Sequence, residues 1–453
     1  MAESTNTIQK EIQDREAKEK RELRRKRRRR NQILAILTLL LFVCLIVAII
    51  GTGVWYIMHR GVGKPAGGGA STTEETTIDN LFESEDEIVK PEETNTEPAL
   101  TPEQQLDAIL DEAFISQMPL EDKVAGLFIV TPESITGVNK AVKAGDGTKD
   151  ALNKYAVGGI VYASQNMQDA AQFTEMVSNT TLYSRYALFT CVAEEGGSST
   201  SLEKAGLADK TDSEQAMGTG ADAAKAYEAS GKIADSMLTY GLNLNFAPVA
   251  DLATVQDSYL KDASYGSDAA LAASFVTSAV QGMQEKGISS CLKYFPGAAD
   301  MKEDPAKGMA SSERTAEQLA AEEFTVFKAG IDAGADMVMV GHVAVPALTG
   351  DNTPCSLSSA VITDKLRNEL GFNGVIITDA MNKGAITEYY EADEAAILAL
   401  KAGCDMILCP DDFEKAYNGV LEAVQNGTIS EERINDSLRR IYRIKYASMM
   451  PEE

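Results

Sequence analysis

One carboxylate, Asp379, stands where α/β proteins carry out chemistry. The residues before it, Val375–Thr378, are apolar up to the final threonine and predict a strand that is buried on both faces. Asp379 would then lie at the carboxyl end of this strand, the end at which parallel sheets bind ligands. Because an unpaired buried carboxylate is costly, core packing explains Asp379 poorly. The structural alternative is an aspartate that caps or anchors the segment after the strand.

Other polar residues also follow apolar runs that predict strands. They are Glu195, Asp251, Lys293, Tyr294 and His342, with Asp304 in the loop after Tyr294. Carboxylates, a lysine and a histidine around an apolar pocket suit a polar, neutral ligand such as a sugar. Two carboxylates that flank a glycosidic bond can hydrolyse it, one by attack and the other by proton transfer. Lys293 would bind sugar hydroxyls, and the alternative is a Schiff-base lysine in an aldolase-like barrel.

Eight apolar runs alternate with helical stretches from about Thr101 onward. The expected strands are Val124–Val130, Val157–Ala163, Ala187–Ala193, Leu242–Val249, Ile288–Phe295, Met337–Val343, Val375–Thr378 and Met406–Cys409. The expected helices are Ser213–Tyr240, Ala269–Lys286, Ala316–Ala333 and Glu391–Lys401, followed by Phe413–Gln425 and Ser430–Ala447. This alternation predicts an α/β fold, a (β/α)8 TIM-type barrel, with an open doubly wound sheet as the alternative.

Five of these strand ends together resemble glycoside hydrolase family 3. The runs are Glu194–Gly197, Asn245–Asp251, Lys293–Gly297, Gly341–Val343 and Gly374–Asp379. The similarity extends from about Leu106 to Ala447 and is strongest to single-domain bacterial β-N-acetylhexosaminidases. The resemblance implies that Asp379 is the catalytic nucleophile of a retaining glycosidase. It also implies that Lys293, Tyr294, Asp251, His342 and Glu195 surround the substrate, with Asp251 and His342 serving mainly to hold loops.

The chain departs from the family pattern where the proton donor should be. The family motif K-H-F-P-G-H-G-D continues to D-S-H, whose Asp-His pair is the acid/base. This chain has Ala298 at the position of the second motif histidine and Asp304-Pro305-Ala306 in place of D-S-H. Further family residues are replaced by Ala193, Ser198 and Ala263. General acid catalysis typically contributes ~10²–10⁴-fold, so Asp304, Glu303 or Glu313 would have to supply the proton.

Two functions are therefore compatible with the sequence. The first is a glycosidase that hydrolyses terminal N-acetylglucosamine-type β-glycosides, with Asp379 as nucleophile and Asp304 as the substitute acid. The second is a catalytically inactive family 3 barrel that binds cell-wall glycan or a protein partner. An aldolase or another lyase is a third, weaker alternative.

The first hundred residues divide into three parts. Residues 1–31 hold 12 Lys/Arg against 6 Asp/Glu and predict a basic cytoplasmic tail. Residues 32–58 are apolar for longer than the about 20 residues that a transmembrane helix needs. Residues 59–100 predict an acidic disordered linker before the barrel domain, 101–453. The positive-inside rule predicts a single-pass protein of the cell membrane with an extracellular barrel, and a cleaved signal peptide is the alternative.

Composition argues against several other classes of protein. The net charge of the whole chain is −26 although its first 31 residues are basic, so the rest of the chain is strongly acidic and does not favour nucleic-acid binding. Six cysteines, with Cys44 in the apolar segment, leave an odd number outside it, so buried free thiols are expected. The two histidines, His59 and His342, form no cluster with metal-ligand spacing. We therefore expect neither a metal nor a cofactor.

Overall fold

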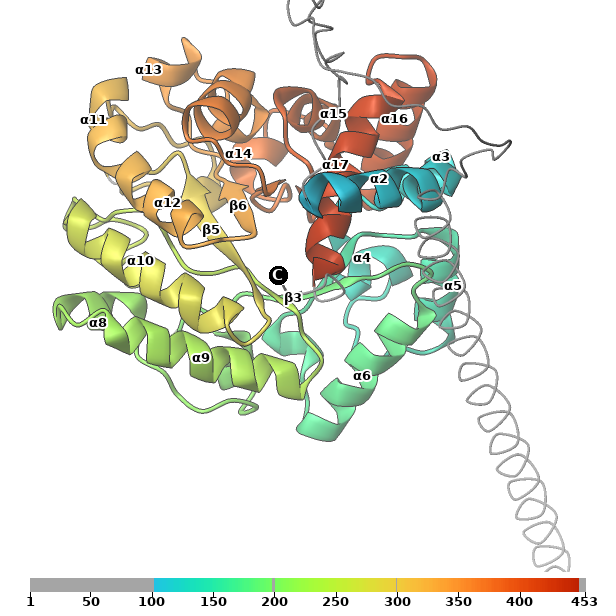
Figure 1. Cartoon of the computed structure of the whole chain (residues 1–453), viewed down its shortest axis with the longest axis horizontal. Helices are drawn as coiled ribbons and strands as arrows, with labels where there is room; N and C mark the ends of the chain where they lie inside the picture. The colour runs from blue at the N-terminus through green and yellow to red at the C-terminus, as the bar shows by residue number, and fades with distance from the viewer. Residues whose placement is uncertain (1–101, 198–199, 299, 448–453) are drawn as a thin grey trace, which may run out of the picture. The chain divides into compact units, whose positions relative to one another are not determined.

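The protein folds as a parallel barrel of eight strands surrounded by helices (Figure 1). The computed structural model describes residues 102–447, except 198–199 and 299. The strands are β1 (Phe128–Val130), β2 (Gly159–Val161), β3 (Phe189–Val192), β4 (Leu244–Asn245), β5 (Ser289–Phe295), β6 (Met337–Val340), β7 (Val375–Thr378) and β8 (Ile407–Leu408). Their order is β7-β6-β5-β4-β3-β2-β1-β8, and a bridge between Ile377 and Met406 joins the two ends. The barrel prediction is confirmed.

All eight expected strands are present, but three expected boundaries were wrong by three or more residues. The fourth strand ends at Asn245 rather than Val249, and the sixth ends at Val340 rather than Val343. The first strand begins at Phe128 rather than Val124, because Leu120–Ala125 forms the helix α3. Pro119 precedes this helix, and Glu121 and Asp122 lie in its first turn, where acidic residues complement the helix dipole. Strand β7 matches its expected range of Val375–Thr378, and all four of its residues are buried.

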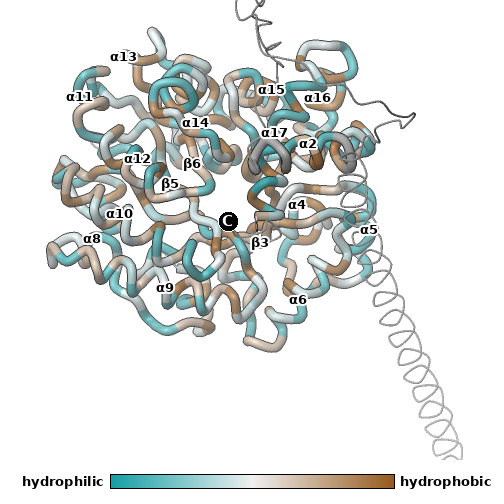
Figure 2. The backbone as a smooth tube through the Cα atoms, viewed as in Figure 1, coloured by the Kyte–Doolittle hydropathy of each residue, from teal (hydrophilic) through white to brown (hydrophobic). Residues whose placement is uncertain are grey.

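Helices follow the strands and cover the outside of the barrel. They are α2 (Pro102–Ala113), α3, α4 (Pro132–Thr136), α5 (Asp146–Lys154), α6 (Ala170–Tyr183), α7 (Ser201–Lys204), α8 (Glu214–Thr219), α9 (Ala224–Thr239), α10 (Ala269–Gln284), α11 (Ala316–Ala321), α12 (Glu323–Asp332), α13 (Pro346–Thr349), α14 (Gly384–Thr387), α15 (Ala392–Ala402), α16 (Phe413–Gln425) and α17 (Glu431–Lys445). Short 3-10 helices are η1 (Ile115–Gln117), η2 (Ser164–Asn166), η3 (Pro305–Lys307) and η4 (Cys355–Leu357), and η5 (Ala360–Glu369) is a π-helix. Figure 2 shows hydrophobic and hydrophilic residues alternating along the outer helices, as expected for elements with one face on the core.

Two expected helices are each divided in two. The stretch 213–240 breaks into α8 and α9 because Ala221 adopts a left-handed backbone conformation, with φ of 51°. The stretch 316–333 breaks between α11 and α12 at Glu322, whose carboxylate pairs with Arg314 at 2.5 Å. The remaining expected helices are confirmed with shifts of a few residues at their ends.

The five cysteines of the described residues are free thiols, as predicted. Cys191, Cys291, Cys355 and Cys404 are buried, and Cys409 is partly buried. They pack as small apolar side chains within the core, where thiols are common.

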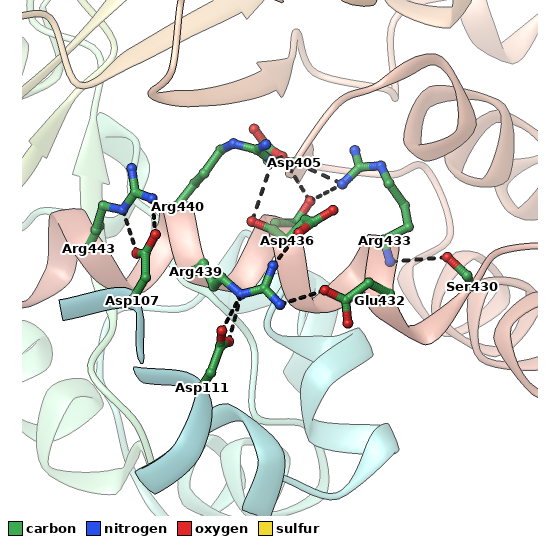
Figure 3. Close-up of polar contacts among 11 residues, drawn as sticks. Asp107, Asp111, Asp405, Ser430, Glu432, Arg433, Asp436, Arg439, Arg440 and Arg443 are labelled. Carbon is green, nitrogen blue, oxygen red and sulfur yellow. Dashed lines mark hydrogen bonds and ion pairs between the residues drawn. The ribbon is translucent and has the colours of Figure 1, made fainter. Parts of the chain in front are cut away.

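One buried carboxylate, Asp405, ties the last helix to the N-terminal ends of β7 and β8. Its two oxygens accept hydrogen bonds from Arg367 Nη2 (2.8 Å), Ile376 N (2.9 Å), Ser437 Oγ (2.8 Å) and Arg440 Nη1 (3.0 Å). Figure 3 shows that a neighbouring face of α17 reaches α2, where Arg439 binds Asp111 and Arg443 binds Asp107. The first and last helices of the barrel domain are thus joined by ion pairs.

The predicted basic tail, membrane anchor and linker lie outside the described residues. Among residues 102–447, apart from 198–199 and 299, no helix combines the length and apolarity that a membrane crossing needs. The prediction for residues 32–58 is therefore untested by the structure.

Replacing Asp405 tests whether this ionic junction stabilises the barrel. Asp405→Ala would leave arginine groups and a backbone amide without their buried acceptor, and we expect a loss of about 3–5 kcal/mol in the free energy of unfolding. Denaturant unfolding of the purified full chain measures this loss. The control is Asp411→Ala, at an exposed position after β8, which should change stability by less than about 0.5 kcal/mol. Equal effects of both substitutions would contradict the structural role of Asp405.

Candidate active site

A cavity of about 260 Å³ opens at the carboxyl ends of the strands. Its lining includes the predicted residues Asp379, Asp304, Tyr294, His342 and Glu195. The other lining residues are Tyr259, Leu260, Ala263, Ala298, Pro305, Ala306, Gly341, Val343 and Lys383. Residues that are far apart in sequence therefore converge, as the barrel topology requires.

Asp379 directly follows β7 and is almost fully buried, with 6% of its surface exposed. Its main-chain N–H donates to the carbonyl of Val340 on β6 at 2.9 Å, which fixes its position at the barrel rim. Its Oδ1 accepts from Ala380 N at 2.7 Å, and its Oδ2 pairs with Lys383 Nζ at 2.6 Å. Burial alone would raise the pKa of Asp379, but the ammonium of Lys383, helped by the main-chain N–H of Ala380, holds that pKa below its usual value. Asp379 is therefore a carboxylate at neutral pH.

Lys293 lies on β5 beneath the cavity and is paired with Glu195. Both side chains are buried, so each needs the other's charge. Burial lowers the pKa of Lys293, but the carboxylates of Glu195 and Glu214 outweigh burial and raise it above its usual range. A Schiff base forms from a neutral amine, so a permanently charged Lys293 disfavours the aldolase-like alternative.

His342 uses both ring nitrogens to hold the protein together. Nε2 lies 3.0 Å from the carbonyl oxygen of Ala380, and Nδ1 lies 2.7 Å from Ser356 Oγ. Because a carbonyl only accepts, Nε2 must carry the proton, and the Ser356 hydroxyl must donate to Nδ1. Burial lowers the pKa of His342, which keeps the ring neutral. His342 thus positions the residue after Asp379 and is not a free proton donor.

Asp251 lies behind the cavity, where it fixes a loop. Both of its oxygens accept from Ala298 N at 2.9 Å, and Oδ1 also accepts from Leu252 N at 2.8 Å. The loop approaches so closely that a Cβ on Gly297 would lie 2.5 Å from Glu323 Cγ, and the φ of Gly297 is +109°. Only glycine suits this position. The contacts of Asp251 agree with the expected loop-holding role and place it outside the cavity lining.

The loop after β5 places alanines where the family pattern has histidines. Ala298 and Ala306 both line the cavity, as does Ala263. Asp304 lines it too, while its Oδ1 accepts from Ala306 N at 2.9 Å and so caps η3. Glu303 and Glu313, the other two suggested acids, are exposed and are not among the lining residues. Of the three expected substitutes, Asp304 is the one that reaches the cavity.

Sequence reasoning missed Lys383 and Tyr259. Lys383 follows Asp379 by four residues, a spacing that favours ion pairs on a helix, but here it spans the turn before α14. Tyr259 comes from the long loop after β4, where no motif marks it. Its phenol lies close enough to Asp251, Asp379 and Asp304 for their charges to raise its pKa, after burial as the main cause.

Glu194, beside Glu195, is buried outside this cavity. Its Oε1 accepts from Ser201 N at 2.6 Å and from Leu202 N at 2.9 Å, at the start of α7. Burial raises the pKa of Glu194 to about 7 despite these two donors. The carboxyl group therefore titrates near neutral pH in the folded protein.

Comparison of this chain with known proteins relates it to one family of enzymes. The family model described as the glycosyl hydrolase family 3 N-terminal domain matches residues 119–444. A beta-hexosaminidase of Stenotrophomonas maltophilia is 30% identical over 284 residues, 60% of this chain and 82% of that protein. A beta-hexosaminidase of Xanthomonas campestris pv. campestris is 32% identical over 270 residues, 57% of this chain and 79% of that protein.

Solved structures give the same result. A glycoside hydrolase family 3 beta-N-acetylglucosaminidase from Paenibacillus sp. superposes with a TM-score of 0.69 and 32% identity, covering 74% of this chain and 64% of that one. A beta-N-acetylhexosaminidase from Beutenbergia cavernae superposes with a TM-score of 0.65 and 26% identity, covering 73% of this chain and 99% of that one.

The raised pKa of Glu194 predicts a specific pH dependence of stability. Between the unfolded value of 4.5 and the folded value of about 7, the folded protein binds more protons, so stability falls as pH rises through this window. Glu194→Gln removes the titration but keeps an acceptor oxygen. We expect wild type to lose roughly 2 kcal/mol more than this variant between about pH 5 and pH 8.

Denaturant unfolding at several pH values measures the difference. Glu228→Gln, at an exposed position on α9, is the control and should retain the wild-type pH profile. Parallel profiles for wild type and Glu194→Gln would show that Glu194 does not titrate in this window.

Proposed function

Because the chain belongs to glycoside hydrolase family 3 and resembles its β-hexosaminidases, we propose that it hydrolyses terminal N-acetylglucosamine-type β-glycosides with retention of configuration. Asp379 would attack the anomeric carbon, and the glycosyl–enzyme ester would then be hydrolysed by water. The ligand would be a glycan, in keeping with the activities of the relatives. The reaction requires no metal or cofactor in this scheme.

The observation that carries the proposal is the ionised carboxylate of Asp379 in the cavity wall. Its position is fixed by β6, by Ala380 and indirectly by His342. A nucleophile held on a rigid strand end needs little reorganisation to reach a sugar bound in the cavity. The lowered pKa keeps it ionised over the whole neutral range.

Asp304 is the proposed substitute for the missing acid. The cavity lining of the described residues contains three carboxylates, Glu195, Asp304 and Asp379. Glu195 is bound to Lys293 and Asp379 is the nucleophile, so Asp304 remains. One of its oxygens caps η3, and the other is the oxygen that could carry the proton.

A second candidate function is binding of a glycan or a protein partner without turnover. Two observations favour it. Ala306 stands in the cavity where the family pattern has the proton-transferring histidine, and Lys383 is bound directly to Asp379. A cavity in which Lys383 is paired with Asp379 and the catalytic histidine is missing can still bind sugars, through Tyr259, Tyr294 and its polar lining residues.

Hydrolysis of an activated substrate tests the nucleophile independently of the acid. We expect the purified full chain to release nitrophenol from para-nitrophenyl β-N-acetylglucosaminide, because such a leaving group needs little acid assistance. Asp379→Ala should reduce kcat/KM by about 10³-fold or more, since the attacking group is removed. Release of nitrophenol, followed by absorbance, is the measurement.

Asp304→Asn is the matched control in the same cavity. It should change the rate with the activated substrate by less than about threefold, and the rate with an unactivated alkyl glycoside by ~10²-fold or more. Equal rates for wild type and Asp379→Ala would exclude Asp379 as nucleophile. No turnover of any aryl glycoside by the wild type would favour the binding function.

The location of the protein is a separate part of the proposal. The apolar residues 32–58 next to a basic tail support a single-pass anchor with the barrel domain on the outer side of the cell membrane. Protease added to intact cells should then digest the barrel domain while a cytoplasmic protein remains whole. Protection of the barrel until the membrane is broken would contradict this orientation.

A further inference from the structure

The proposed nucleophile forms an ion pair with Lys383 in this structure. Lys383 Nζ lies 2.6 Å from Asp379 Oδ2, and the main-chain N–H of Ala380 lies 2.7 Å from Oδ1. Each oxygen of the carboxylate therefore already accepts one strong hydrogen bond. The contact with Lys383 lowers the electron density on Oδ2, and the side chain of Lys383 can move more easily than the main chain.

An ammonium group at this point also opposes the reaction electrostatically. The transition state of glycoside hydrolysis resembles an oxocarbenium ion, so positive charge develops on the sugar beside Asp379. A second positive charge within a few ångströms repels it, and the low dielectric of a cavity strengthens that repulsion. Lys383 in its present position would slow turnover of a neutral sugar.

The two lysines of the site differ in how firmly they are held. Lys293 is buried, with 3% of its side chain exposed, and is neutralised by Glu195 with Glu214 nearby. Lys383 lines the cavity with 26% of its side chain exposed, and its one carboxylate partner among the described residues is Asp379. The ring of Tyr294 lies 5.4 Å from each ammonium. Lys383 is thus the cation that a ligand in the cavity can reach.

We infer that Lys383 is a specificity-determining residue that selects sugars carrying a carboxylate. An anionic group on the bound sugar would draw the ammonium away from Asp379 Oδ2 and neutralise it. One step would then release the nucleophile and remove the opposing charge. A neutral sugar offers no such partner, so Asp379 would stay paired. This inference rests on the proposed function because it assigns the substrate class of the same site.

The chemical step itself is unchanged by the selection. A bond forms between an Asp379 oxygen and the anomeric carbon as the bond to the leaving oxygen breaks, and the leaving group departs with the electron pair. The oxygen of a water molecule then bonds to the anomeric carbon as the bond to Asp379 breaks, which restores the carboxylate, and the proton that the water loses balances the anionic leaving group. Lys383 keeps its proton throughout and exchanges one carboxylate partner for another.

A pair of substrates that differ in one charge tests the inference. The acid is a para-nitrophenyl β-N-acetylglucosaminide with a lactic acid ether on O3, and the neutral partner is its methyl ester. A second pair, para-nitrophenyl β-glucuronide and its methyl ester, places the carboxylate at C6 instead. We expect the full chain to prefer the acid of at least one pair by about tenfold or more in kcat/KM.

Substitution of Lys383 separates its charge from its bulk. Lys383→Met should raise kcat/KM for the neutral ester by about tenfold and abolish the preference for the acid, whereas Lys383→Arg should retain the preference. Lys302→Met removes an exposed lysine from the loop after β5 and should leave the ratio of acid to ester within about twofold. A thermal melt of each variant confirms that it is folded.

The outcomes distinguish this inference from the proposed function. Equal rates on acid and ester for both pairs, or a preference that survives in Lys383→Met, would overturn the role of Lys383 while leaving the glycosidase intact. If no substrate is hydrolysed, calorimetric binding of the free sugar acid and its ester decides instead. Tighter binding of the acid that is lost in Lys383→Met would support selection by Lys383 and refute only the turnover, and equal binding would refute the selection.

Discussion

The need to neutralise buried charges at the mouth of the barrel determines the structure of this site. Glu195, Lys293 and Asp379 are all buried at the carboxyl ends of the strands, and none could remain charged there alone. The pairing of Lys293 with Glu195 neutralises the floor of the cavity, and Lys383 neutralises its wall at Asp379. At the opposite end of the barrel Asp405 meets the same requirement with arginines and a main-chain donor. The two ends differ in the carboxylate itself: Asp379 lines a cavity, whereas the side chain of Asp405 is wholly buried.

The same constraint explains which polar residues support the fold and which face the ligand. Asp251 satisfies two main-chain amides of a loop, and His342 links Ser356 to the carbonyl of Ala380. These side chains would be required even in a barrel without catalytic activity, because unsatisfied buried groups are costly. Their presence therefore says little about turnover. The residues that do bear on turnover are those whose polar atoms face the cavity, namely Asp379, Asp304 and Lys383.

The sequence was sufficient to predict the barrel, its eight strands and the position of Asp379, because each depends on local patterns. A continuous apolar run predicts a buried parallel strand, and the chemistry of a barrel lies at the strand ends. The break at Ala221 and the helix before Phe128 depend on single backbone conformations, which composition does not reveal. Tyr259 reaches the cavity from a long irregular loop, and Lys383 reaches Asp379 across a turn, so neither follows from periodicity. The roles of Asp251 and His342 came from resemblance, and their contacts were visible only once the loops were placed.

The replacement of histidines by alanines is inexpensive for the fold but decisive for the chemistry. Ala298 and Ala306 replace histidines of the family pattern, Ala263 replaces an arginine, and all three line the cavity. Because His342 is neutral and bound to the main chain, Asp379 is balanced by Lys383, a lysine that a ligand can displace. A neutral sugar leaves that balance intact, whereas an anionic sugar competes for the lysine directly. The charge of the ligand, rather than the strength of a resident acid, then becomes the factor that decides whether Asp379 is free to react.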